Sequence, residues 1–493
     1  MKGMLLKALG LFTEEDVPQR LEVSRPGAEA DRSRLVQALS AYLTRLGAPR
    51  EALSALHALA HPEGKAILTG QQPGLLGGPA YTFYKAHTAL RLRDEGKGRP
   101  VAAVFWVASH DHDVEEVRHL HLLAEERLLT LSLPLPSRPL GRISLEPYRE
   151  GLKEALALFP KDERLDYALS AGTLSESFAR LLLAYLGPRG LLVFDPMAEE
   201  LAPLLVEGLL EELEDPLASA EAINREASRI RALGGRPTLR RKPGATNLFL
   251  ETDQRRLLFY EEGVFTDGKG RYTKKELREI LLSDPTRLTP AAGLRPVLQD
   301  RIFPTAALVA GPNELLYLAE LSGVYALHRV PLPAFVRRLS ALVIEPPVRR
   351  ILEKYRLDPW AFVGREEAFQ EALRPHLEEV VRFEERLKRL LEEAEALTEE
   401  AKALRPGLVR PLARFRARVL GEGERLLSKA LRQRLLEDEV LSRHLHRLKL
   451  HLRPLDTPQE RVYPFVMYAL RHPVALERLQ ALPALGRHRI DLD

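Results

Sequence analysis

A glycine-rich segment between two apolar runs constrains the fold of this chain most strongly. Residues 69–85 read Thr-Gly-Gln-Gln-Pro-Gly-Leu-Leu-Gly-Gly-Pro-Ala-Tyr-Thr-Phe-Tyr-Lys. They follow a short apolar run at 66–68 and lead into a helical pattern over 81–94. Residues 101–109 are then almost wholly apolar, which is typical of a strand buried on both faces of a parallel sheet. A strand, a helix and a second strand within about 45 residues predict a βαβ unit.

The glycines of this turn have two interpretations. A glycine-rich turn lets backbone N–H groups approach a ligand and points a helix N-terminus at it. However, the spacing is neither G-x-G-x-x-G nor a P-loop that ends in Gly-Lys-Ser/Thr, so the glycines could serve only the geometry of a strand-to-helix turn. The candidate binding residues of the segment are Gly70, Gln71, Gln72, Gly74, Gly77, Gly78, Tyr81 and Lys85.

Strands and helices alternate through the first 375 residues. Two segments, 114–170 and 215–290, interrupt this alternation, and we interpret them as insertions. The pattern predicts an α/β domain over 1–375, built on a doubly wound parallel sheet with two insertions. The remaining predicted strands of that sheet are 191–195, 303–311 and 341–344.

A different pattern begins after the α/β segment. Apolar residues recur at three-and-four spacing over 376–404 and 408–450, with prolines and a glycine between the two runs. They predict two long helices joined by a turn, which is an antiparallel coiled-coil hairpin. The hairpin would occupy 376–452, and the C-terminal segment, 453–493, would return to the core.

The predicted hairpin indicates an oligomer. Its apolar stripe is longer than the contact between its own helices requires, so that Phe415 and Val419 would otherwise face water. We therefore expect a homodimer formed through the coiled coil. Gly421 and Gly423 are expected to weaken the second helix locally.

The composition bounds the class of protein. A chain of 493 residues exceeds one compact core, so we expect at least two domains. The chain contains no cysteine, which excludes disulfides, thiolate metal ligands and cysteine nucleophiles. Its net charge of +4 is small for this length and no basic cluster emerges, so we expect no nucleic-acid partner. Asparagine occurs only at 224, 247 and 313 while charged residues abound, which indicates a thermophilic source.

The same composition predicts a cytoplasmic protein. No apolar run approaches the roughly 18–20 residues that a membrane span needs. The N-terminal segment lacks the small-residue cleavage site of a signal peptide. We therefore expect no membrane partner.

Four ionisable residues follow the apolar run at 101–109. His110, Asp111, His112 and Asp113 stand where ligands bind in open α/β sheets, beyond the carboxyl ends of the strands. They could bind a metal, serve as acid and base, hold an amine, or form a polar loop without function. Neighbouring loop residues point to opposite sides, so we do not expect a metal site. Asp111, His112 and Asp113 are the catalytic candidates, with His112 and Asp113 in general acid–base work.

A third cluster lies at 294–314. Arg295, Gln299 and Asp300 could bind a ligand or form an internal hydrogen-bond network. Asn313 and Glu314 begin a predicted helix after a strand, where they could face a ligand or only cap the helix. Three such clusters at one edge of a sheet favour a single binding site.

These motifs resemble those of the BshC family of bacillithiol synthesis. The resemblance spans nearly the whole chain. His110 stands where the family usually has Glu, so a carboxylate role does not carry over to it, whereas Asp111, His112 and Asp113 match the family pattern. The similar segments are Gly-Gln-Gln-Pro-Gly-Leu at 70–75, Phe-Trp-Val-Ala-Ser-His-Asp-His-Asp at 105–113, Leu-Arg-Pro-Val-Leu-Gln-Asp at 294–300, Val-Ala-Gly-Pro-Asn-Glu at 309–314 and Pro-Gln-Glu-Arg-Val-Tyr-Pro at 458–464.

The resemblance implies a Rossmann-like core with two insertions, as in class I aminoacyl-tRNA synthetases, and a dimerising coiled coil. It also implies a ligase that joins L-cysteine to glucosaminyl-malate and so completes bacillithiol. The cysteine carboxyl must then be activated, and ATP or another nucleotide is the expected co-substrate, with Lys85 or Arg295 offsetting negative charge. The chain has neither the His-Ile-Gly-His nor the Lys-Met-Ser-Lys-Ser motif of those synthetases.

Two alternatives remain open, because a fold does not dictate a function. One is another adenylate-forming or nucleotidyl-transfer enzyme on the same fold. The other is a non-catalytic coiled-coil scaffold that retains a nucleotide pocket.

Overall fold

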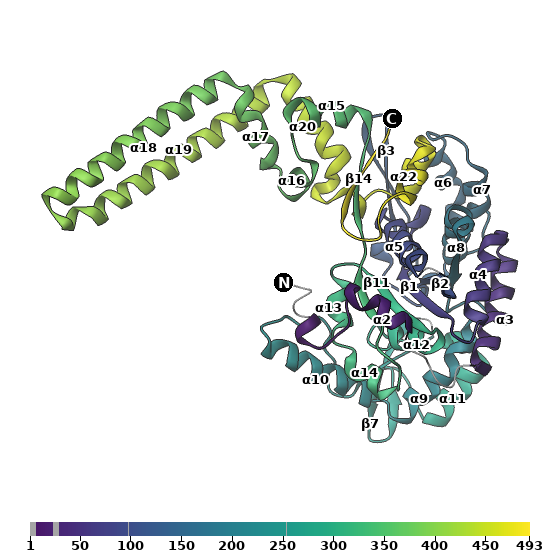
Figure 1. Ribbon diagram of the computed structural model, residues 1–493. Helices are drawn as coiled ribbons and strands as arrows, with labels where there is room; N and C mark the ends of the chain where they lie inside the picture. Colours follow the sequence, from purple (N-terminus) through teal and green to yellow (C-terminus); the bar gives the residue numbers. More distant parts are fainter. Residues whose placement is uncertain (1–5, 23–28, 97, 253) are drawn as a thin grey trace. The chain divides into compact units, whose positions relative to one another are not determined.

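The computed structural model describes residues 6–22, 29–96, 98–252 and 254–493 (Figure 1). The described chain divides into two compact units. Unit 1 lies within Met1–Ala124, Leu129–Ala341 and Tyr463–His488, and unit 2 comprises Glu125–Leu128, Leu342–Val462 and Arg489–Asp493. None of the helices in these ranges is both long enough and apolar enough to cross a membrane.

A five-stranded parallel sheet with the order β12-β11-β1-β2-β5 forms the centre of unit 1 (Figure 1). From β1 the chain builds the sheet first in one direction, through β2 and β5, and later in the other, through β11 and β12. This reversal beside β1 makes the sheet doubly wound, as predicted. The strands are β1 (Lys65–Gln71), β2 (Val101–Val107), β5 (Leu191–Phe194), β11 (Thr305–Ala310) and β12 (Ala334–Arg337).

Helices cover the sheet because its strands are apolar on both faces. Every residue of β2 is buried. Helix α5 packs on β1 and β2, α4 on β2 and β5, and α8 on β5, while α21 and α22 near the C-terminus contact α5. These elements are α4 (Arg50–Ala60), α5 (Tyr81–Glu95), α8 (Leu174–Leu186), α21 (Phe465–Arg471) and α22 (Val474–Gln480), and α2 (Val17–Glu22) and α3 (Glu29–Arg45) precede them.

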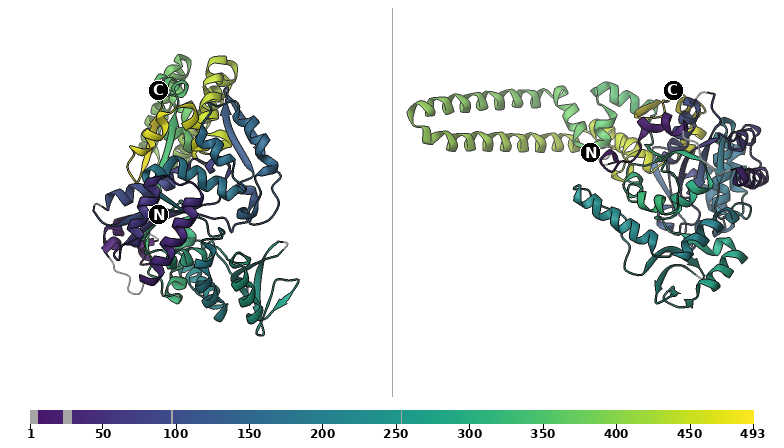
Figure 2. Two further views of the ribbon diagram at one scale, coloured as in Figure 1. Left: turned by 90° about the vertical axis from the view of Figure 1, so that its right-hand side faces the viewer. Right: turned by 60° about the horizontal axis from the view of Figure 1, so that its bottom comes forward.

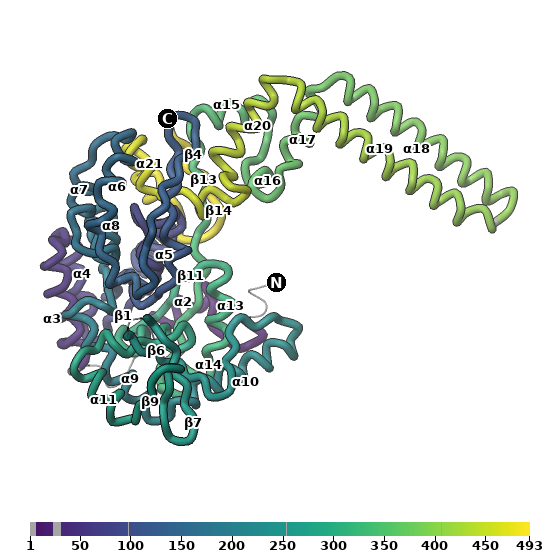
Figure 3. Tube along the Cα trace, turned by 180° about the vertical axis from the view of Figure 1, so that it is seen from behind, coloured from purple at the N-terminus to yellow at the C-terminus, as the bar shows by residue number. Residues whose placement is uncertain are grey.

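Two long connections between strands of the sheet carry further elements. The first, between β2 and β5, holds the hairpin of β3 (His119–Ala124) and β4 (Arg127–Ser132), with α6 (Arg149–Leu156) and α7 (Glu163–Leu169). The second, between β5 and β11, holds an antiparallel sheet of order β10-β6-β7-β8-β9, part of which is labelled in Figure 3. Its elements are α9 (Val206–Glu214), α10 (Ala218–Ala232), β6 (Ala245–Glu251), β7 (Arg255–Glu261), β8 (Val264–Thr266), β9 (Arg271–Tyr272), α11 (Lys274–Ser283), β10 (Leu288–Pro290) and α12 (Arg295–Ile302). Between β11 and β12 lie α13 (Glu314–Leu318) and α14 (Ser322–Leu327).

The prediction that a strand at 341–344 continues the parallel sheet is wrong. The strand exists as β13 (Ser340–Ile344), but it pairs with β14 (Arg487–Asp491) in a two-stranded sheet, and β12 takes the place beside β11. All residues of β13 are buried. An apolar run therefore showed that the strand is covered, but it carries no information about which strand lies next to it.

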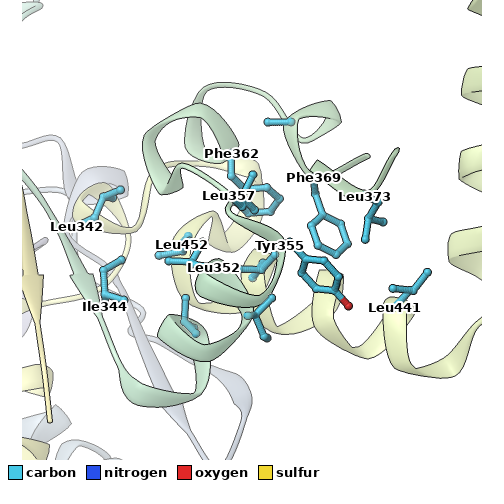
Figure 4. Packing of buried hydrophobic residues seen from close by; sticks show 14 of the residues in the cluster. Leu342, Ile344, Leu352, Tyr355, Leu357, Phe362, Phe369, Leu373, Leu441 and Leu452 are labelled. Atoms are coloured by element: carbon cyan, nitrogen blue, oxygen red, sulfur yellow. The ribbon is translucent and has the colours of Figure 1, made fainter. Parts of the chain in front are cut away.

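The core of unit 2 is a cluster of apolar side chains, most of them from four helices, with Leu342 and Ile344 of β13 and Leu435 of the helix Val409–Glu437 added (Figure 4). Leu352, Tyr355, Phe362, Phe369 and Leu452 are each no more than 4% exposed. Burial of one such side chain stabilises the fold by roughly 1.5–3 kcal/mol. The helices are α15 (Pro346–Tyr355), α16 (Pro359–Gly364), α17 (Glu367–Leu373) and α20 (Glu439–Leu452).

The predicted coiled-coil hairpin is present. Helices α18 (Glu378–Leu404) and α19 (Val409–Glu437) lie side by side and are joined by the short η10 (Pro406–Leu408) (Figure 2). Ion pairs connect Arg416 with Glu395 at 2.8 Å and Arg434 with Glu379 at 3.5 Å. These pairs join the start of one helix to the end of the other, so the hairpin is antiparallel.

Two details of the hairpin add to the prediction. Helix α19 continues through its glycines, and a Cβ atom at Gly423 would lie 2.5 Å from Leu387 Cδ2. Gly423 therefore allows the close approach of the two helices, and the local weakening expected at Gly421 and Gly423 stays a prediction. The second predicted helix is divided at Asp438, whose carboxylate accepts the N–H groups of Val440 and Leu441 and so caps α20.

A buried histidine of unit 2 lies between two carboxylates. In His451, which is 2% exposed, Nδ1 lies 3.0 Å from Glu345 Oε2 and Nε2 lies 3.5 Å from Glu126 Oε1. Burial alone lowers the pKa of His451, but the two carboxylates outweigh burial and raise that pKa above its ordinary value. The same contact lowers the pKa of Glu126 to about 2. A charged imidazolium thus connects α20 with the start of α15.

We predict that His451→Gln lowers stability more at pH 6 than at pH 9. The pKa of His451 is raised on folding, so its stabilisation is complete below the unfolded value of about 6.5 and is lost as the pH rises through the folded pKa. Removing one partner of a buried ion pair costs about 3–5 kcal/mol, so we expect about 3 kcal/mol at pH 6 in urea unfolding. His446→Gln, an exposed position on the same helix, is the matched control. An equal loss at both pH values would contradict the role of the imidazolium charge.

Candidate functional site

A pocket of about 290 Å³ lies at the carboxyl edge of the parallel sheet of unit 1, beside the reversal between β1 and β11. Ligands of open α/β sheets bind at such a reversal. The volume is near the lower end of ordinary ligand pockets, about 300–1,000 Å³. The lining residues are Gly70, Gln71, Gln72, Trp106, Ala108, Asp111, Glu116, Ala292, Arg295, Pro296, Gln299, Leu308, Val309, Ala310, Glu314, Tyr317 and Leu318.

Lys85 of α5 connects the end of β1 to α13. Its Nζ atom donates to Gly70 O and Gln71 Oε1, both at 2.9 Å, and lies 2.5 Å from Glu314 Oε1, with the Lys85 side chain only 1% exposed. Burial lowers the pKa of Lys85, which Glu314 partly opposes. In turn, burial raises the pKa of Glu314, but Lys85 outweighs this and lowers it. Because all three donors of the ammonium are used, Lys85 stabilises the pocket wall rather than offering a free donor.

Asp111 follows β2 and presents a fixed negative charge to the pocket. Its Oδ1 accepts the N–H group of His112 at 2.8 Å, and its Oδ2 accepts Gln72 Nε2 at 2.9 Å. Burial by itself raises the pKa of Asp111, but the guanidinium groups of Arg295 and Arg255 and these hydrogen bonds lower it below the ordinary value. The carboxylate is therefore ionised at neutral pH.

Arg295, in the first turn of α12, presents a positive charge to the same pocket. Its side chain hydrogen-bonds Tyr317, and in the described part of the chain no carboxylate lies within the 4.0 Å of an ion pair. Burial lowers the pKa of Arg295, but Tyr317 and Asp111 outweigh this and raise it. A partly buried guanidinium without a paired anion is costly, so Arg295 is a candidate for binding an anionic group.

His110 lies behind the pocket wall rather than in it. The residue is 3% exposed and hydrogen-bonds the Pro196 carbonyl, and its Nδ1 has no hydrogen-bond partner in the described structure. Burial, followed by the charges of Arg255 and Arg295, lowers the pKa of His110 well below its ordinary value. The imidazole is therefore neutral.

His112 and Asp113 do not line the pocket. His112 Nδ1 lies 3.2 Å from Arg255 Nη1, and because a guanidinium only donates, the proton of the neutral imidazole is on Nε2. Burial and Arg255 lower the pKa of His112. Asp113 is exposed, and its carboxylate accepts the N–H group of Glu115 at the start of η3 (Val114–Glu116). Neither residue contacts the pocket, so direct catalysis by His112 or Asp113 stays a prediction.

One glycine of the turn lines the pocket, and the other three serve the geometry of the turn. Gly70 lines the pocket, where a Cβ atom would lie 2.7 Å from Trp106 O. Gly74, Gly77 and Gly78 do not line it. A Cβ atom on Gly74 would lie 2.7 Å from Gly78 Cα, and Gly77 and Gly78 have φ angles of +84° and +66°. For these three glycines the contacts support a role in turn geometry.

Of the residues predicted around 294–314, some line the pocket and others do not. Gln299 lines the pocket. Asp300 is fully buried in an internal network, in which it accepts Thr305 Oγ1 at 2.8 Å and Tyr325 OH at 2.6 Å. Asn313 is exposed at the start of α13 and does not line the pocket. Of the two roles considered for this cluster, ligand binding is therefore open to Arg295, Gln299 and Glu314.

Tyr81 and Arg338 form a layer behind the pocket. Gln71 Nε2 donates to Tyr81 OH at 3.2 Å. The Arg338 guanidinium lies 5.3 Å from the centre of the Tyr81 ring. Tyr81 therefore fixes the side chain of Gln71 rather than lining the pocket itself.

Three residues of the site escaped the sequence analysis. Glu116 and Tyr317 line the pocket, and Arg255 contacts His112 from β7 of the antiparallel sheet. Tyr317 lies three residues beyond Glu314 on one helix face, so helical spacing could have identified it. Glu116 stands in the predicted insertion at 114–170, where no motif marks it. Nothing in the local sequence around Arg255 connects it with His112, which lies 143 residues earlier in the chain.

Metal binding has no obvious location in the described ranges, where no three histidine, aspartate or glutamate side chains gather as a metal-binding group.

The fold and the pocket define a Rossmann-like α/β protein with a charged small-molecule site and a coiled-coil arm. Two family models match the chain. The N-terminal Rossmann-like domain of bacillithiol biosynthesis BshC matches residues 10–339, and the C-terminal coiled-coil domain of BshC matches residues 341–487. The chain belongs to the BshC family, which confirms the resemblance seen in its motifs.

Relatives match over nearly the full length. A protein of Thermus thermophilus is 63% identical over 484 residues, which are 98% of each chain. A protein of Heliobacterium modesticaldum is 33% identical over 487 residues, or 90% of this chain and 86% of the relative. One of Bacillus anthracis is 29% identical over 483 residues, or 93% and 89%. Each is named "putative cysteine ligase BshC".

We predict that Lys85→Met destabilises unit 1 by about 1–3 kcal/mol, because the half-buried Glu314 and the acceptors of Gly70 and Gln71 would lose their donor. The double variant Lys85→Met/Glu314→Gln should recover much of this loss, since it removes both charges. Urea unfolding measures both. Lys153→Met is the control, because Lys153 pairs with Glu150 at 2.9 Å on the surface and should cost less than about 0.5 kcal/mol. A Lys85→Met variant as stable as this control would contradict the role of the pair.

Proposed function

We propose that this protein is a ligase that joins the carboxyl group of L-cysteine to the amine of glucosaminyl-malate and so forms bacillithiol. Membership of the BshC family and the names of the relatives support this proposal. The single observation that carries it is the pairing of charges in the pocket, where Arg295 lacks a carboxylate partner and Asp111 is a fixed anion. An amino acid carries the matching carboxylate and ammonium groups.

Amide formation requires an activated carboxyl group and a deprotonated amine. ATP, the co-substrate expected from the family, would supply the energy of activation. The pocket residues fit one anionic group, because Arg295 is uncommitted while Lys85 is held by Glu314. Arg295 would bind the carboxylate or a phosphoryl oxygen and offset its charge. A scaffold protein would not need such an unpaired guanidinium in a pocket, so the catalytic alternatives are favoured.

We predict that the purified protein converts L-cysteine, glucosaminyl-malate and ATP into bacillithiol. With ¹⁸O in the cysteine carboxyl group, mass spectrometry should find the label in AMP or in phosphate, since an activated carboxyl oxygen leaves with the nucleotide fragment. Arg295→Met should reduce the rate by roughly 10²-fold or more, because it removes the charge that orients the anion. Reactions without each substrate are the controls. Product formed without consumption of nucleotide would refute the ATP-driven mechanism.

We further propose that the coiled-coil arm forms a homodimer. Four exposed apolar residues of α18 recur at every seventh position, namely Phe383, Leu390, Leu397 and Leu404, with exposed fractions of 41, 49, 52 and 77%. Such a heptad stripe is typical of a helix that packs against a further helix. On α19, Phe415 is 51% exposed, whereas Val419, which we expected to face water, is half-buried.

We predict that Leu390→Lys/Leu397→Lys converts a dimer into a monomer with an intact α/β core, because two charges would be placed in the apolar contact. Sedimentation equilibrium at micromolar concentration measures the mass. Glu392→Lys/Glu399→Lys has the same spacing on the polar face of the helix and should remain dimeric. A wild-type protein that sediments as a monomer would show that the stripe has another partner.

A further inference from the structure

Two carboxylates in the wall of the pocket share one amide group. Gln72 Nε2 donates to Asp111 Oδ2 at 2.9 Å, and the same amide lies near enough to Glu116 to favour its ionised form. Both carboxylates line the pocket. An amide nitrogen has two N–H groups, so Gln72 can hold both acceptors at once.

The charged groups around these two carboxylates are of opposite sign. Asp111 faces the guanidinium groups of Arg295 and Arg255. Glu116 faces the carboxylates of Asp111, Asp113 and Glu314, and no cation of the described chain forms an ion pair with it. Glu116 is exposed at the pocket mouth, and the desolvation of its inner part, followed by the charges of Asp113 and Asp111, raises the pKa of Glu116, while the pKa of Asp111 is lowered.

When the pKa values of two neighbouring acids are shifted in opposite directions, the two acids can take different roles. The group whose pKa is low remains an anion at neutral pH. The group whose pKa is raised toward neutrality is the better proton acceptor, because it can both bind and release a proton at the working pH. In this pocket the first description fits Asp111 and the second fits Glu116.

The other candidates for proton transfer are committed elsewhere. His112 Nδ1 accepts a hydrogen bond from Arg255, so its Nε2 carries a proton and cannot accept one. The Asp113 carboxylate caps η3. Neither residue lines the pocket, whereas Glu116 does.

We propose that Glu116 is the catalytic base that takes the proton from the attacking amine, and that Asp111 stays ionised and positions Gln72. This inference rests on the ligase function proposed above. The N–H bond of the substrate ammonium breaks, its electron pair remains on nitrogen, and the proton moves to a carboxylate oxygen of Glu116. A nucleoside triphosphate first converts the cysteine carboxylate into an acyl phosphate or acyl adenylate. The nitrogen pair then bonds to the acyl carbon, and the C–O bond to phosphate or AMP breaks with its electron pair on that oxygen. The second proton that nitrogen loses as the amide forms passes to solvent.

The test compares Glu116→Gln with Glu115→Gln. The substitution at 116 preserves size but removes the basic oxygen, so amide formation should fall by roughly 10²-fold or more while the KM for cysteine changes little. The rate of this variant should recover as the pH rises, since the amine then loses its proton to solvent. Glu115, on the same short helix, is 67% exposed in its side chain and pairs with Arg118, so its variant should match the wild type. Glu116→Asp should restore part of the activity.

Hydroxylamine separates activation from proton transfer, because it is largely unprotonated at neutral pH and needs no base. Glu116→Gln should therefore form cysteine hydroxamate from cysteine, ATP and hydroxylamine at the wild-type rate. Wild-type amide formation in Glu116→Gln, or loss of hydroxamate together with the amide, would overturn the assignment. If the wild-type protein formed no amide at all, the proposed function itself would be refuted. That outcome differs from a failure of the Glu116 assignment, in which the wild-type protein remains active.

Discussion

The buried ammonium of Lys85 is the interaction on which the site depends. It joins the carbonyl of Gly70 and the amide of Gln71 at the end of β1 to the carboxylate of Glu314 at the start of α13. A charge is buried only where it is paired and hydrogen-bonded, so this arrangement fixes three elements relative to one another. The two walls of the pocket follow from it, because Gln72 extends from β1 and Tyr317 from α13.

The pocket has an ordered pattern of charge rather than a general polarity. Asp111 is held as an anion, Arg295 as a cation without a paired carboxylate, and His110 as a neutral group behind them. These states have different causes. Burial decides the state of His110, whereas the neighbouring guanidinium groups decide that of Asp111. A zwitterionic substrate would complete the pattern, as the proposed amino-acid ligase requires.

Sequence patterns predicted the architecture well because its determinants are local. The wholly apolar run after the glycine-rich segment predicted β2, and the two periodic runs predicted the hairpin of α18 and α19. Asp111, Arg295 and Glu314 were identified because they follow strands or begin helices at one sheet edge. The pairing of β13 with β14 was not predictable, because the same apolar run fits an interior strand of the parallel sheet or of a small separate sheet.

The sequence by itself determined most of the secondary structure, the doubly wound character of the core and the sheet edge at which the pocket lies. Only the tertiary structure decided which side chains of that edge face the pocket and what charge each one carries. Asp113 and Glu116 are both acidic residues of one short segment, yet Asp113 caps a short helix and Glu116 lines the pocket. The physical reason is that periodicity is a property of neighbouring residues, whereas burial and electrostatic environment sum over elements that are distant in the chain, as Arg255 of β7 shows for His112.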